Sequence, residues 1–359
     1  MEGSVINIDK KQFQNDLIDW FHTEKRDLPW RRTADPYQIW ISEIMLQQTR
    51  VDTVIPYYKR FVEKFPTLHD LAMADEEVLL KQWEGLGYYS RARNLQAGVR
   101  EVAEKYGGKV PGSRKEILAL KGVGPYTAGA VLSIAYGLPE HAVDGNVMRV
   151  LSRILLIDED IAKPKTRKVF EEAVTALISH EDPSAFNQGL MELGALVCTP
   201  TSPKCLLCPV REHCAAFNEG RQHELPVKTK AKTNKGVNYA MVAIRSGESL
   251  LMEKRPSTGL LANMWQFPLL EIAESIGAPG VEERLSEQFK GTVEKAEKIT
   301  SFKHVFSHLT WNVDGFIAKG VNLEIPENMK WVNAAEMDLL PISGPVQKMK
   351  TALTSRGDA

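Results

Sequence analysis

The chain has 359 residues, of which 43% are hydrophobic and 25% are charged, and its formal net charge is −1. This composition is typical of a globular protein with two or three domains, and the near-zero charge does not by itself indicate a nucleic-acid binder. No apolar run reaches the roughly 18 residues of a membrane-spanning helix. The first ten residues contain Glu2 and Asp9 and do not resemble a signal peptide. We therefore expect a cytoplasmic protein without membrane association.

Apolar residues recur at helical spacing through the first two-thirds of the chain. No segment before residue 200 alternates convincingly with a period of two, as an exposed strand would. We therefore predict an all-α region. Its expected helices cover residues 13–23, 37–51, 54–65, 75–83, 90–106, 113–120, 126–135, 145–155, 165–179 and 186–197.

The pattern changes after Cys214. Residues 225–236 are polar and rich in lysine, which is typical of an exposed linker. From Val237 onward, strand-like stretches predict a smaller α+β domain. The expected strands cover residues 239–245, 249–254, 299–304 and 309–317. We divide the chain into an all-α region (1–226), a linker (227–236) and an α+β domain (237–359).

A tight turn joins two of the predicted helices. In Gly122-Val-Gly124-Pro125 the glycines tolerate positive φ, and the proline can open the second helix. Such a helix-hairpin-helix can direct bare backbone N–H groups at a phosphate, and a side chain at Gly122 or Gly124 would hold the phosphate off. An ordinary helix connection fits this stretch alone equally well.

Two carboxylates lie in contrasting surroundings. Glu43 is surrounded by apolar residues, so burial would raise its pKa and keep a proton on it, although a Glu on an exposed stripe of the helix fits as well. Asp144 lies where the helix from Gly145 begins, where a helix N-cap is the ordinary role and the helix start favours the ionised form. One protonated and one ionised acid can together cleave a glycosidic bond through a cation-like state.

All four cysteines lie close together, as Cys198-x6-Cys205-x2-Cys208-x5-Cys214. In a cytosolic protein this density indicates a metal site and not disulfides. Four thiolates suit a tetrahedral zinc ion or a four-iron cluster. Because one pair alone is closely spaced, the spacing favours the iron–sulfur cluster, with zinc as the alternative.

Six stretches of the chain together resemble the helix-hairpin-helix DNA glycosylase superfamily, which includes endonuclease III, and within it the MutY-type adenine-specific mismatch glycosylases. The resemblance runs from residue 13 to about 226, and the tail resembles the second domain of that family. It implies removal of adenine mispaired with 8-oxoguanine or guanine in double-stranded DNA, and a [4Fe-4S] cluster in the cysteine loop. The stretches are residues 28–31, 40–49, 85–94, 122–128, 143–146 and the cysteine loop 198–214.

The resemblance also implies roles for individual residues. Glu43 would protonate N7 of adenine, and Asp144 would stabilise the sugar cation, by its charge or by transient covalent attachment. Tyr126 and Asn146 would be hydrogen-bonding partners in the same pocket. The residues implied around a flipped-out adenine are Arg26, Trp30, Arg31 and Gln188.

The base opposite adenine has its own implied residues. Tyr88 would wedge into the stack that the adenine leaves, whereas Leu86 fits an apolar core as well. The full set is Gln48, Thr49, Leu86 and Tyr88, with Gly122 and Gly124 on the DNA backbone.

We expect a monomer, whose repair-protein partners the sequence does not identify.

The tail resembles the Nudix hydrolase fold. Hydrolysis of nucleotides needs a helix with an Arg-Glu-x-x-Glu-Glu pattern, and the nearest candidates, Glu282, Glu283, Arg284 and Glu287, do not reproduce it. We therefore expect the tail to recognise 8-oxoguanine. The matching residues are Phe306, Ser307 and His308, and a serine hydroxyl can accept the N7–H of the modified base. Packing at a strand end is the alternative role for all three.

Two other functions remain from the sequence. An endonuclease III-like enzyme would also cut the backbone with a lysine just after the hairpin, where this chain has Tyr126, which cannot form a Schiff base. We therefore expect base removal without efficient strand cleavage, with Lys121 near enough for slow scission. A DNA lesion sensor without enzymatic activity is the other alternative, but it would not need the pair Glu43 and Asp144.

Overall fold

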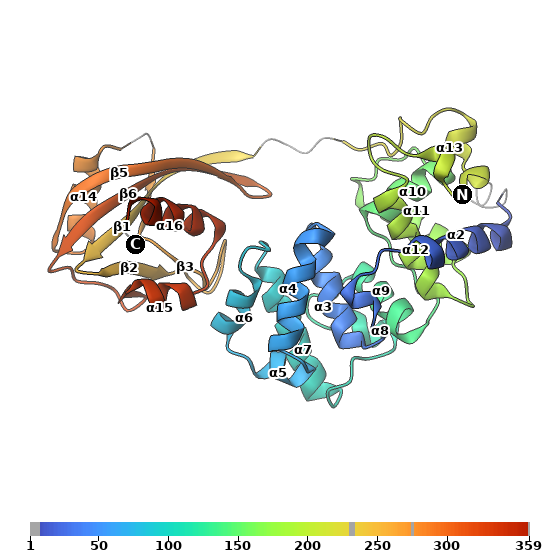
Figure 1. Cartoon of the computed structure of the whole chain (residues 1–359), viewed down its shortest axis with the longest axis horizontal. Coiled ribbons are helices and arrows are strands. Elements are labelled where there is room, and N and C mark those ends of the chain that lie inside the picture. The colour runs from blue at the N-terminus through green and yellow to red at the C-terminus, as the bar shows by residue number, and fades with distance from the viewer. Residues whose placement is uncertain (1–7, 230–233, 274–275, 358–359) are drawn as a thin grey trace. The chain divides into compact units, whose positions relative to one another are not determined.

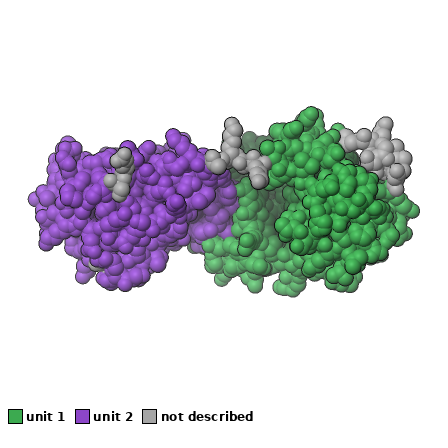
Figure 2. Space-filling model, turned by 90° about the horizontal axis from the view of Figure 1, so that it is seen from above, with its two compact units in different colours: residues 1–73, 94–230 green, residues 74–93, 231–359 purple. Residues whose placement is uncertain are grey.

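A computed structural model of the chain describes residues 8–229, 234–273 and 276–357 (Figure 1). The chain divides into two compact units, one of residues 1–73 and 94–230 and one of residues 74–93 and 231–359 (Figure 2). A helical region followed by an α+β region confirms the predicted fold class. None of the described helices has both the length and the apolar character required to cross a bilayer.

The first unit is helical throughout its described part. Helix α6 (Glu76–Trp83) belongs to the second unit, and α7 begins there. The helices of the first unit are α2 (Lys10–Glu24), α3 (Pro36–Leu46), α4 (Val51–Lys64), α5 (Leu68–Met73), α7 (Ser90–Lys105), α8 (Arg114–Leu118), α9 (Pro125–Tyr136), α10 (Gly145–Ile154), α11 (Pro164–Leu177), α12 (Pro183–Leu196) and α13 (Ala215–Asn218), with the 3-10 helices η1 (Pro29–Arg31), η2 (Cys205–Leu207) and η3 (Arg211–His213).

Aspartate side chains fix where several helices begin. A carboxylate that accepts a backbone N–H of the first turn satisfies a donor that would otherwise have no partner in the helix. Asp9, Asp35, Asp144 and Asp182 do this for α2, α3, α10 and α12. The last two caps place α10 and α12 so that both contribute to one core, in which Leu151, Phe170 and Leu193 are fully buried.

The predicted helix over 37–51 is shorter than expected. Helix α3 ends at Leu46, and Gln48 adopts a left-handed backbone conformation with φ 58° before α4 starts at Val51. The apolar pattern continues across this break, so its period did not reveal the turn. Helix α5 was not predicted either, because six residues are too short for a clear helical period.

The hairpin consists of α8, the turn at residues 122–124 and α9. Gly122 has φ +77°, and a Cβ on it would lie 2.6 Å from the Cβ of Asn94. Gly124 is extended, and a Cβ there would meet no atom within 4 Å. Gly129 brings α9 against the next segment, since a Cβ there would lie 1.7 Å from the carbonyl oxygen of His141. The hairpin therefore needs Gly122 and Gly129 for packing.

The second unit is built on a mixed sheet in the order β3-β2-β1-β6-β5, with β4 paired to β1 and β7 paired to β2. The long strands β1 and β6 run parallel, and the other pairs are antiparallel. The strands are β1 (Lys235–Ser246), β2 (Ser249–Lys254), β3 (Trp265–Gln266), β4 (Leu269–Ile272), β5 (Thr292–Val305), β6 (Leu309–Val321) and β7 (Met329–Val332), and the helices are α14 (Ala278–Gln288), α15 (Ala334–Leu339) and α16 (Gly344–Arg356).

Helices cover both faces of this sheet. Val242 and Ile244 of β1 pack in one core with Leu285 of α14, whereas Met241 packs in the other core with Met349 of α16. Because β1 is buried on both faces, its middle is apolar without alternation. Strands β3, β4 and β7 have two to four residues each and were not predicted, nor were the three helices.

The predicted linker is partly ordered by its neighbours. The backbone carbonyl of Val227 accepts the N–H of Ile161, and Thr229 bonds to Asp160. Residues 235 and 236 already belong to β1. Residues 230–233 of the linker, like the chain ends 1–7 and 358–359, lie outside the described residues. The division at 1–226, 227–236 and 237–359 stays a prediction.

We expect Gly122→Ala to lower the free energy of unfolding by about 1–3 kcal/mol, because the new methyl group overlaps Asn94 and the left-handed backbone disfavours alanine. Urea unfolding followed by circular dichroism measures the loss. Gly124→Ala is the matched control and should unfold like the wild type. Equal stability of the two variants would contradict the packing role of Gly122.

Candidate active site and metal centre

The first unit contains a cavity of about 780 Å³ where α3, the hairpin turn, the start of α10 and α12 meet. Residues far apart in the sequence line it together. The predicted residues on its wall are Arg26, Trp30, Arg31, Glu43, Gln48, Thr49, Gly122, Gly124, Tyr126, Asp144, Asn146 and Gln188. The two candidate acids therefore open into the same space.

Glu43 lies on α3 and is 5% exposed. Tyr126, in the first turn of α9, donates its phenol hydrogen to Glu43 Oε2 across 2.5 Å. Burial raises the pKa of Glu43 to about 7; the charge of Asp144 also raises it, while the hydrogen bond from Tyr126 and the charge of Arg31 lower it. A carboxyl group with this pKa can hold and release a proton near neutral pH.

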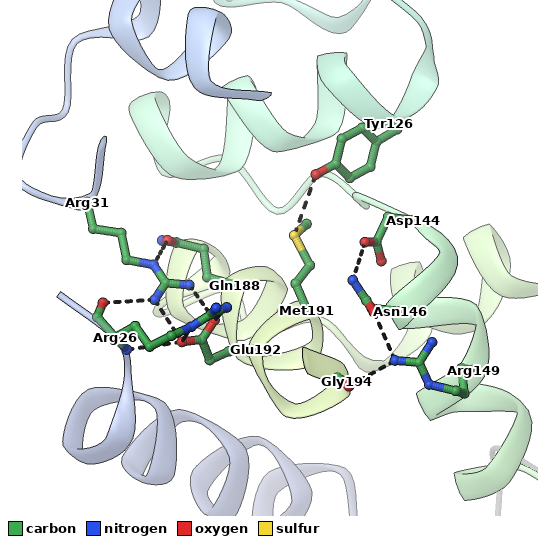
Figure 3. Close-up of polar contacts among 10 residues, drawn as sticks. All are labelled: Arg26, Arg31, Tyr126, Asp144, Asn146, Arg149, Gln188, Met191, Glu192 and Gly194. Carbon is green, nitrogen blue, oxygen red and sulfur yellow. Dashed lines mark hydrogen bonds and ion pairs between the residues drawn. The ribbon is translucent and has the colours of Figure 1, made fainter. Parts of the chain in front are cut away.

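Asp144 is the N-cap of α10. Its carboxylate accepts the backbone N–H of Val147 at 2.7 Å. It also accepts a hydrogen bond from Nδ2 of Asn146 at 2.9 Å (Figure 3). The sequence suggested that the helix start would hold this acid ionised. Burial outweighs these hydrogen bonds, however, and the pKa of Asp144 is raised from its usual range. A raised pKa does not by itself protonate the acid, so the ionised form expected for Asp144 stays a prediction, opposed by a burial that the sequence did not show.

Arg149 fixes the orientation of Asn146. Its Nη2 donates to Asn146 Oδ1 and to the carbonyl oxygen of Gly194, both at 2.8 Å (Figure 3). With its oxygen held by Arg149, the amide of Asn146 presents its Nδ2 to Asp144. The Nε of Arg149 donates to the carbonyl oxygen of Cys198 at 2.9 Å. Sequence reasoning missed this role, although Arg149 lies one helical turn after Asn146.

A second buried acid, Glu192 on α12, organises another part of the wall. Arg26 and Arg31 each donate two side-chain hydrogen bonds to its carboxylate, at 2.8–3.0 Å (Figure 3). Although burial opposes the charged form, the hydrogen bonds from the arginines lower the pKa of Glu192 to about 2. Arg31 Nε also donates to Oε1 of Gln188 at 3.2 Å. The predicted Arg26, Arg31 and Gln188 thus form one rigid group.

Sequence reasoning missed Glu192 although the signal was present. Like Glu43, it is a lone acid in an apolar helix. Trp30 is buried beside this group and packs edge-to-face on Tyr58, with ring centroids 5.4 Å apart. Its rigid aromatic surface forms part of the cavity wall.

Of the residues predicted near the opposite base, Gln48 and Thr49 lie on the cavity wall of the first unit. The others belong to the second unit: Leu86, Tyr88, Phe306, Ser307 and His308. Ser307 Oγ donates to the phenol oxygen of Tyr88 at 2.9 Å, so two residues from separate predicted motifs lie together. Tyr88 is 46% exposed, whereas Leu86 is 6% exposed and fits the apolar-core role. Phe306 packs on Trp311 and is half-buried, and His308 is exposed.

The loop that presents Tyr88 has an unusual backbone. Gly85, Gly87 and Tyr88 all have positive φ, at 98°, 68° and 47°. Arg91 stabilises the loop, because its Nη2 donates to the carbonyl oxygens of Leu86 and Gly87 at 3.1 and 3.2 Å. Its guanidinium carbon lies 5.4 Å from the centroid of the Tyr88 ring. The exposed phenol is therefore held from its inner side.

The four cysteines line one small hollow of about 30 Å³ in the first unit. In the described chain, no group of three or more His, Cys, Asp or Glu side chains is arranged around a point to hold a metal ion. A single zinc ion would need four sulfurs about 2.3 Å from one point, whereas a larger cluster holds its ligands further apart. The four sulfurs are therefore gathered at one hollow, and the choice between a cluster and a zinc ion stays a prediction.

The charge around the hollow also suits an anionic centre. Arg153 is 2% exposed, and its Nη1 lies 3.2 Å from Cys198 Sγ. Its other hydrogen bonds go to backbone carbonyl oxygens, including that of Thr199. Burial raises the pKa of Cys208 to about 12, so its thiolate needs a stabilising cation. A metal centre with four thiolate ligands would satisfy both Cys208 and Arg153.

Two family models match the chain. Residues 41–176 match "HhH-GPD superfamily base excision DNA repair protein", and residues 239–352 match "NUDIX domain". The human protein named adenine DNA glycosylase is 35% identical over 399 aligned residues, which cover 94% of this chain and 73% of the human one.

Solved structures match the helical part. A thermostable thymine-DNA glycosylase is 33% identical with a TM-score of 0.54, covering 58% of this chain and 97% of its own. A trapped covalent intermediate of endonuclease III with DNA is 28% identical with a TM-score of 0.50, covering 59% of this chain and 99% of its own. The helix-hairpin-helix and Nudix-like parts predicted from the sequence are therefore confirmed.

Replacing Tyr126 with Phe is expected to raise the pKa of Glu43 above about 7 by about one pH unit, because the donated hydrogen bond stabilises the carboxylate. Carbon-13 NMR of the labelled carboxyl group during a pH titration measures the change. Met191→Leu is the control: Met191 Sδ lies 3.7 Å from the same phenol oxygen, and its loss should leave the pKa in place. An unchanged pKa in the Phe variant would exclude Tyr126 as a regulator of Glu43.

Proposed function

The chain belongs to the adenine DNA glycosylases, base-excision repair enzymes that hydrolyse the N-glycosyl bond of adenine in DNA, and from this premise we propose that it acts on adenine paired with 8-oxoguanine or guanine, without cutting the strand. The observation that carries the catalytic part of this proposal is the shared cavity of Glu43 and Asp144. Its volume suits one flipped-out purine.

Glu43 is the general acid in this proposal. Its pKa of about 7 lets it carry a proton to N7 of adenine near neutral pH. Protonation makes adenine a better leaving group, so the glycosidic bond can break with its electron pair moving to the base. The hydrogen bond from Tyr126 holds the carboxyl group in one orientation and stabilises the carboxylate that remains.

Asp144 stabilises the positive charge that develops on the sugar. Hydrogen bonds from Val147 and Asn146 fix the direction of its carboxylate. Such a preorganised charge needs little rearrangement when the cation forms. Water then adds to the sugar carbon and releases a proton, which completes the hydrolysis.

The group of Arg26, Arg31 and Gln188 forms the adenine pocket in this proposal. Glu192 uses the arginines as hydrogen-bond donors and holds them rigid, and Gln188 keeps an amide edge at the cavity wall. An extruded base is read along its edge and by stacking, which suits this group together with Trp30. A wall fixed by ion pairs also limits the side-chain entropy lost on binding.

We propose that the second unit reads the base opposite adenine. Tyr88 and Ser307 place two hydroxyl groups 2.9 Å apart at the surface of this unit. Because each hydroxyl both donates and accepts, the pair can meet the N7–H of 8-oxoguanine, which guanine lacks. Hydrolysis of nucleotides is not proposed, since Glu282 accepts the backbone N–H of Ala296 and its helix lacks the required pattern.

We propose that Cys198, Cys205, Cys208 and Cys214 hold a [4Fe-4S] cluster. When bound, such a cluster supplies a rigid, negatively charged anchor for the loop. The chain's own residues carry out the base removal. Arg153 and the peptide of Cys198 connect the loop to α10, whose first residue follows Asp144.

A single-turnover assay of adenine release from an 8-oxoguanine:adenine duplex tests the function. We expect release by the wild type and a loss of about 10²–10⁴-fold with Glu43→Gln, which cannot donate a carboxyl proton. The rate should fall about tenfold per pH unit above pH 7, as Glu43 with its pKa of about 7 loses its proton. At low pH it should fall again as Asp144 becomes protonated.

The controls separate the alternative functions. Borohydride added during the reaction should trap little covalent protein–DNA adduct, since Tyr126 stands where a lyase has its lysine and Lys121 allows slow scission alone. Abundant adduct together with strand cleavage would support the endonuclease III-like alternative. Absence of adenine release by the wild type would end the glycosylase proposal, and full activity of Glu43→Gln would remove Glu43 from its role.

The metal is identified by elemental analysis of the purified protein. We expect about four iron and four sulfide per chain, with brown visible absorbance. Cys214→Ser should lose iron, because one of four ligands is missing. One zinc per chain without sulfide would contradict the cluster and support a zinc ion at the four cysteines instead.

A further inference from the structure

Residues 74–93 are part of the helical region by sequence but pack within the second unit. Helix α6 in this segment is attached at its start by Glu77, whose Oε1 accepts hydrogen bonds from Lys254 Nζ at 2.6 Å and from Trp265 Nε1 at 3.1 Å. The segment also carries the loop with Tyr88. Because this loop follows α6, the contacts that anchor α6 in the second unit also set the position of Tyr88.

The end of α6 is attached through Glu84. Its Oε1 accepts from Gln347 Nε2 at 2.9 Å, and its Oε2 accepts the backbone N–H of Ile342 at 3.1 Å. Lys81 donates to the same Oε2 at 2.9 Å and to the carbonyl oxygen of Leu340 at 3.1 Å. The Glu84 side chain is 17% exposed, so water competes little for these bonds. Both carboxylate oxygens are therefore engaged.

Glu84 directly precedes the loop that presents Tyr88. Gly85 and Gly87 in this loop tolerate many backbone conformations, so the loop needs a fixed starting point. Ser307, whose hydroxyl bonds to that of Tyr88, lies between β5 and β6. Helix α16 carries Gln347 and is also bonded to β5, because Lys348 Nζ donates to the carbonyl oxygen of Lys303. Glu84 is therefore bonded to α16, which is bonded to β5, and Ser307 follows the end of β5.

We propose that Glu84 is a positioning residue for reading the base opposite adenine. It holds the start of the loop against α16 so that the hydroxyl groups of Tyr88 and Ser307 meet. This inference rests on the proposed recognition of 8-oxoguanine by that pair. It concerns the choice between opposite bases and leaves the excision step to the cavity of the first unit.

The test compares two matched substitutions at the two ends of α6. In Glu84→Gln, the amide oxygen can keep the bonds from Ile342 and Lys81, and the new NH₂ faces Gln347. Gln347→Leu is therefore combined with it, so that the Gln347 amide cannot turn its oxygen to the NH₂ and this anchor is lost.

In Glu77→Gln, the amide oxygen can keep both bonds, because Lys254 and Trp265 approach the same oxygen. Both substitutions therefore remove one negative charge from α6, but only the substitution at Glu84, combined with Gln347→Leu, removes a hydrogen bond that anchors the helix.

Single-turnover adenine release is measured for each variant on 8-oxoguanine:adenine and guanine:adenine duplexes. We expect Glu84→Gln with Gln347→Leu to lower the preference for 8-oxoguanine about tenfold, mainly through the 8-oxoguanine duplex, and Glu84→Ala to lower it at least as far. Glu77→Gln should keep the wild-type preference. Adding Ser307→Ala to Glu84→Ala should lower the preference little further, because both changes separate the same hydroxyl pair.

The outcomes distinguish this inference from the proposed function. If the wild type shows no preference for 8-oxoguanine, the proposed recognition itself is wrong. If the wild type shows it and both Glu84 variants retain it, the role of Glu84 is excluded. An equal loss in Glu77→Gln, or fully additive losses with Ser307→Ala, would assign the effect to general loosening of α6 and overturn the inference. Thermal melting confirms that each variant is folded, and Glu84→Gln with Gln347→Leu carries the test if Glu84→Ala does not fold.

Discussion

The structure of the first unit depends on the burial of Glu43 against the phenol of Tyr126. Removing the carboxyl group from water disfavours its charge, and the hydrogen bond returns part of that cost, which leaves the pKa at about 7. This balance requires α3 and α9 to pack closely. The glycines of the hairpin fix its other contacts, because a Cβ on Gly122 would overlap Asn94 and a Cβ on Gly129 would overlap the carbonyl oxygen of His141.

Around the same cavity, the pKa values of buried acids are shifted in opposite directions. Glu192 is held ionised, with its pKa at about 2, by two arginines that it also immobilises. Burial raises the pKa of Asp144 from its usual range, and the hydrogen bonds from Val147 and Asn146 oppose that rise. Burial and the partners of each carboxylate together set its pKa, and with it the role that we propose for Glu43, Asp144 and Glu192.

In the proposed function, the two units divide base removal from the reading of the opposite base. The cavity with Glu43 and Asp144 is built from residues of the first unit, whereas Tyr88 and Ser307 form their hydrogen bond within the second. Residues 74–93 take part in this division, because a segment inside the helical region by sequence is held by Glu77 and Glu84 among the strands and helices of the tail.

The sequence by itself determined the helical region, the α+β tail, the hairpin turn and the cysteine loop, since these follow from local patterns such as apolar period and glycine placement. It also identified Glu43, because a lone acid in an apolar helix is visible without a structure. Tertiary structure decided what the same signal means at Glu192, where hydrogen bonds from two arginines lower a pKa that burial alone would raise, and it showed how deeply Asp144 is buried. It likewise decided that residues 74–93 pack with the tail. Burial and pairing between distant residues set these outcomes, and neither is encoded in any local stretch of the chain.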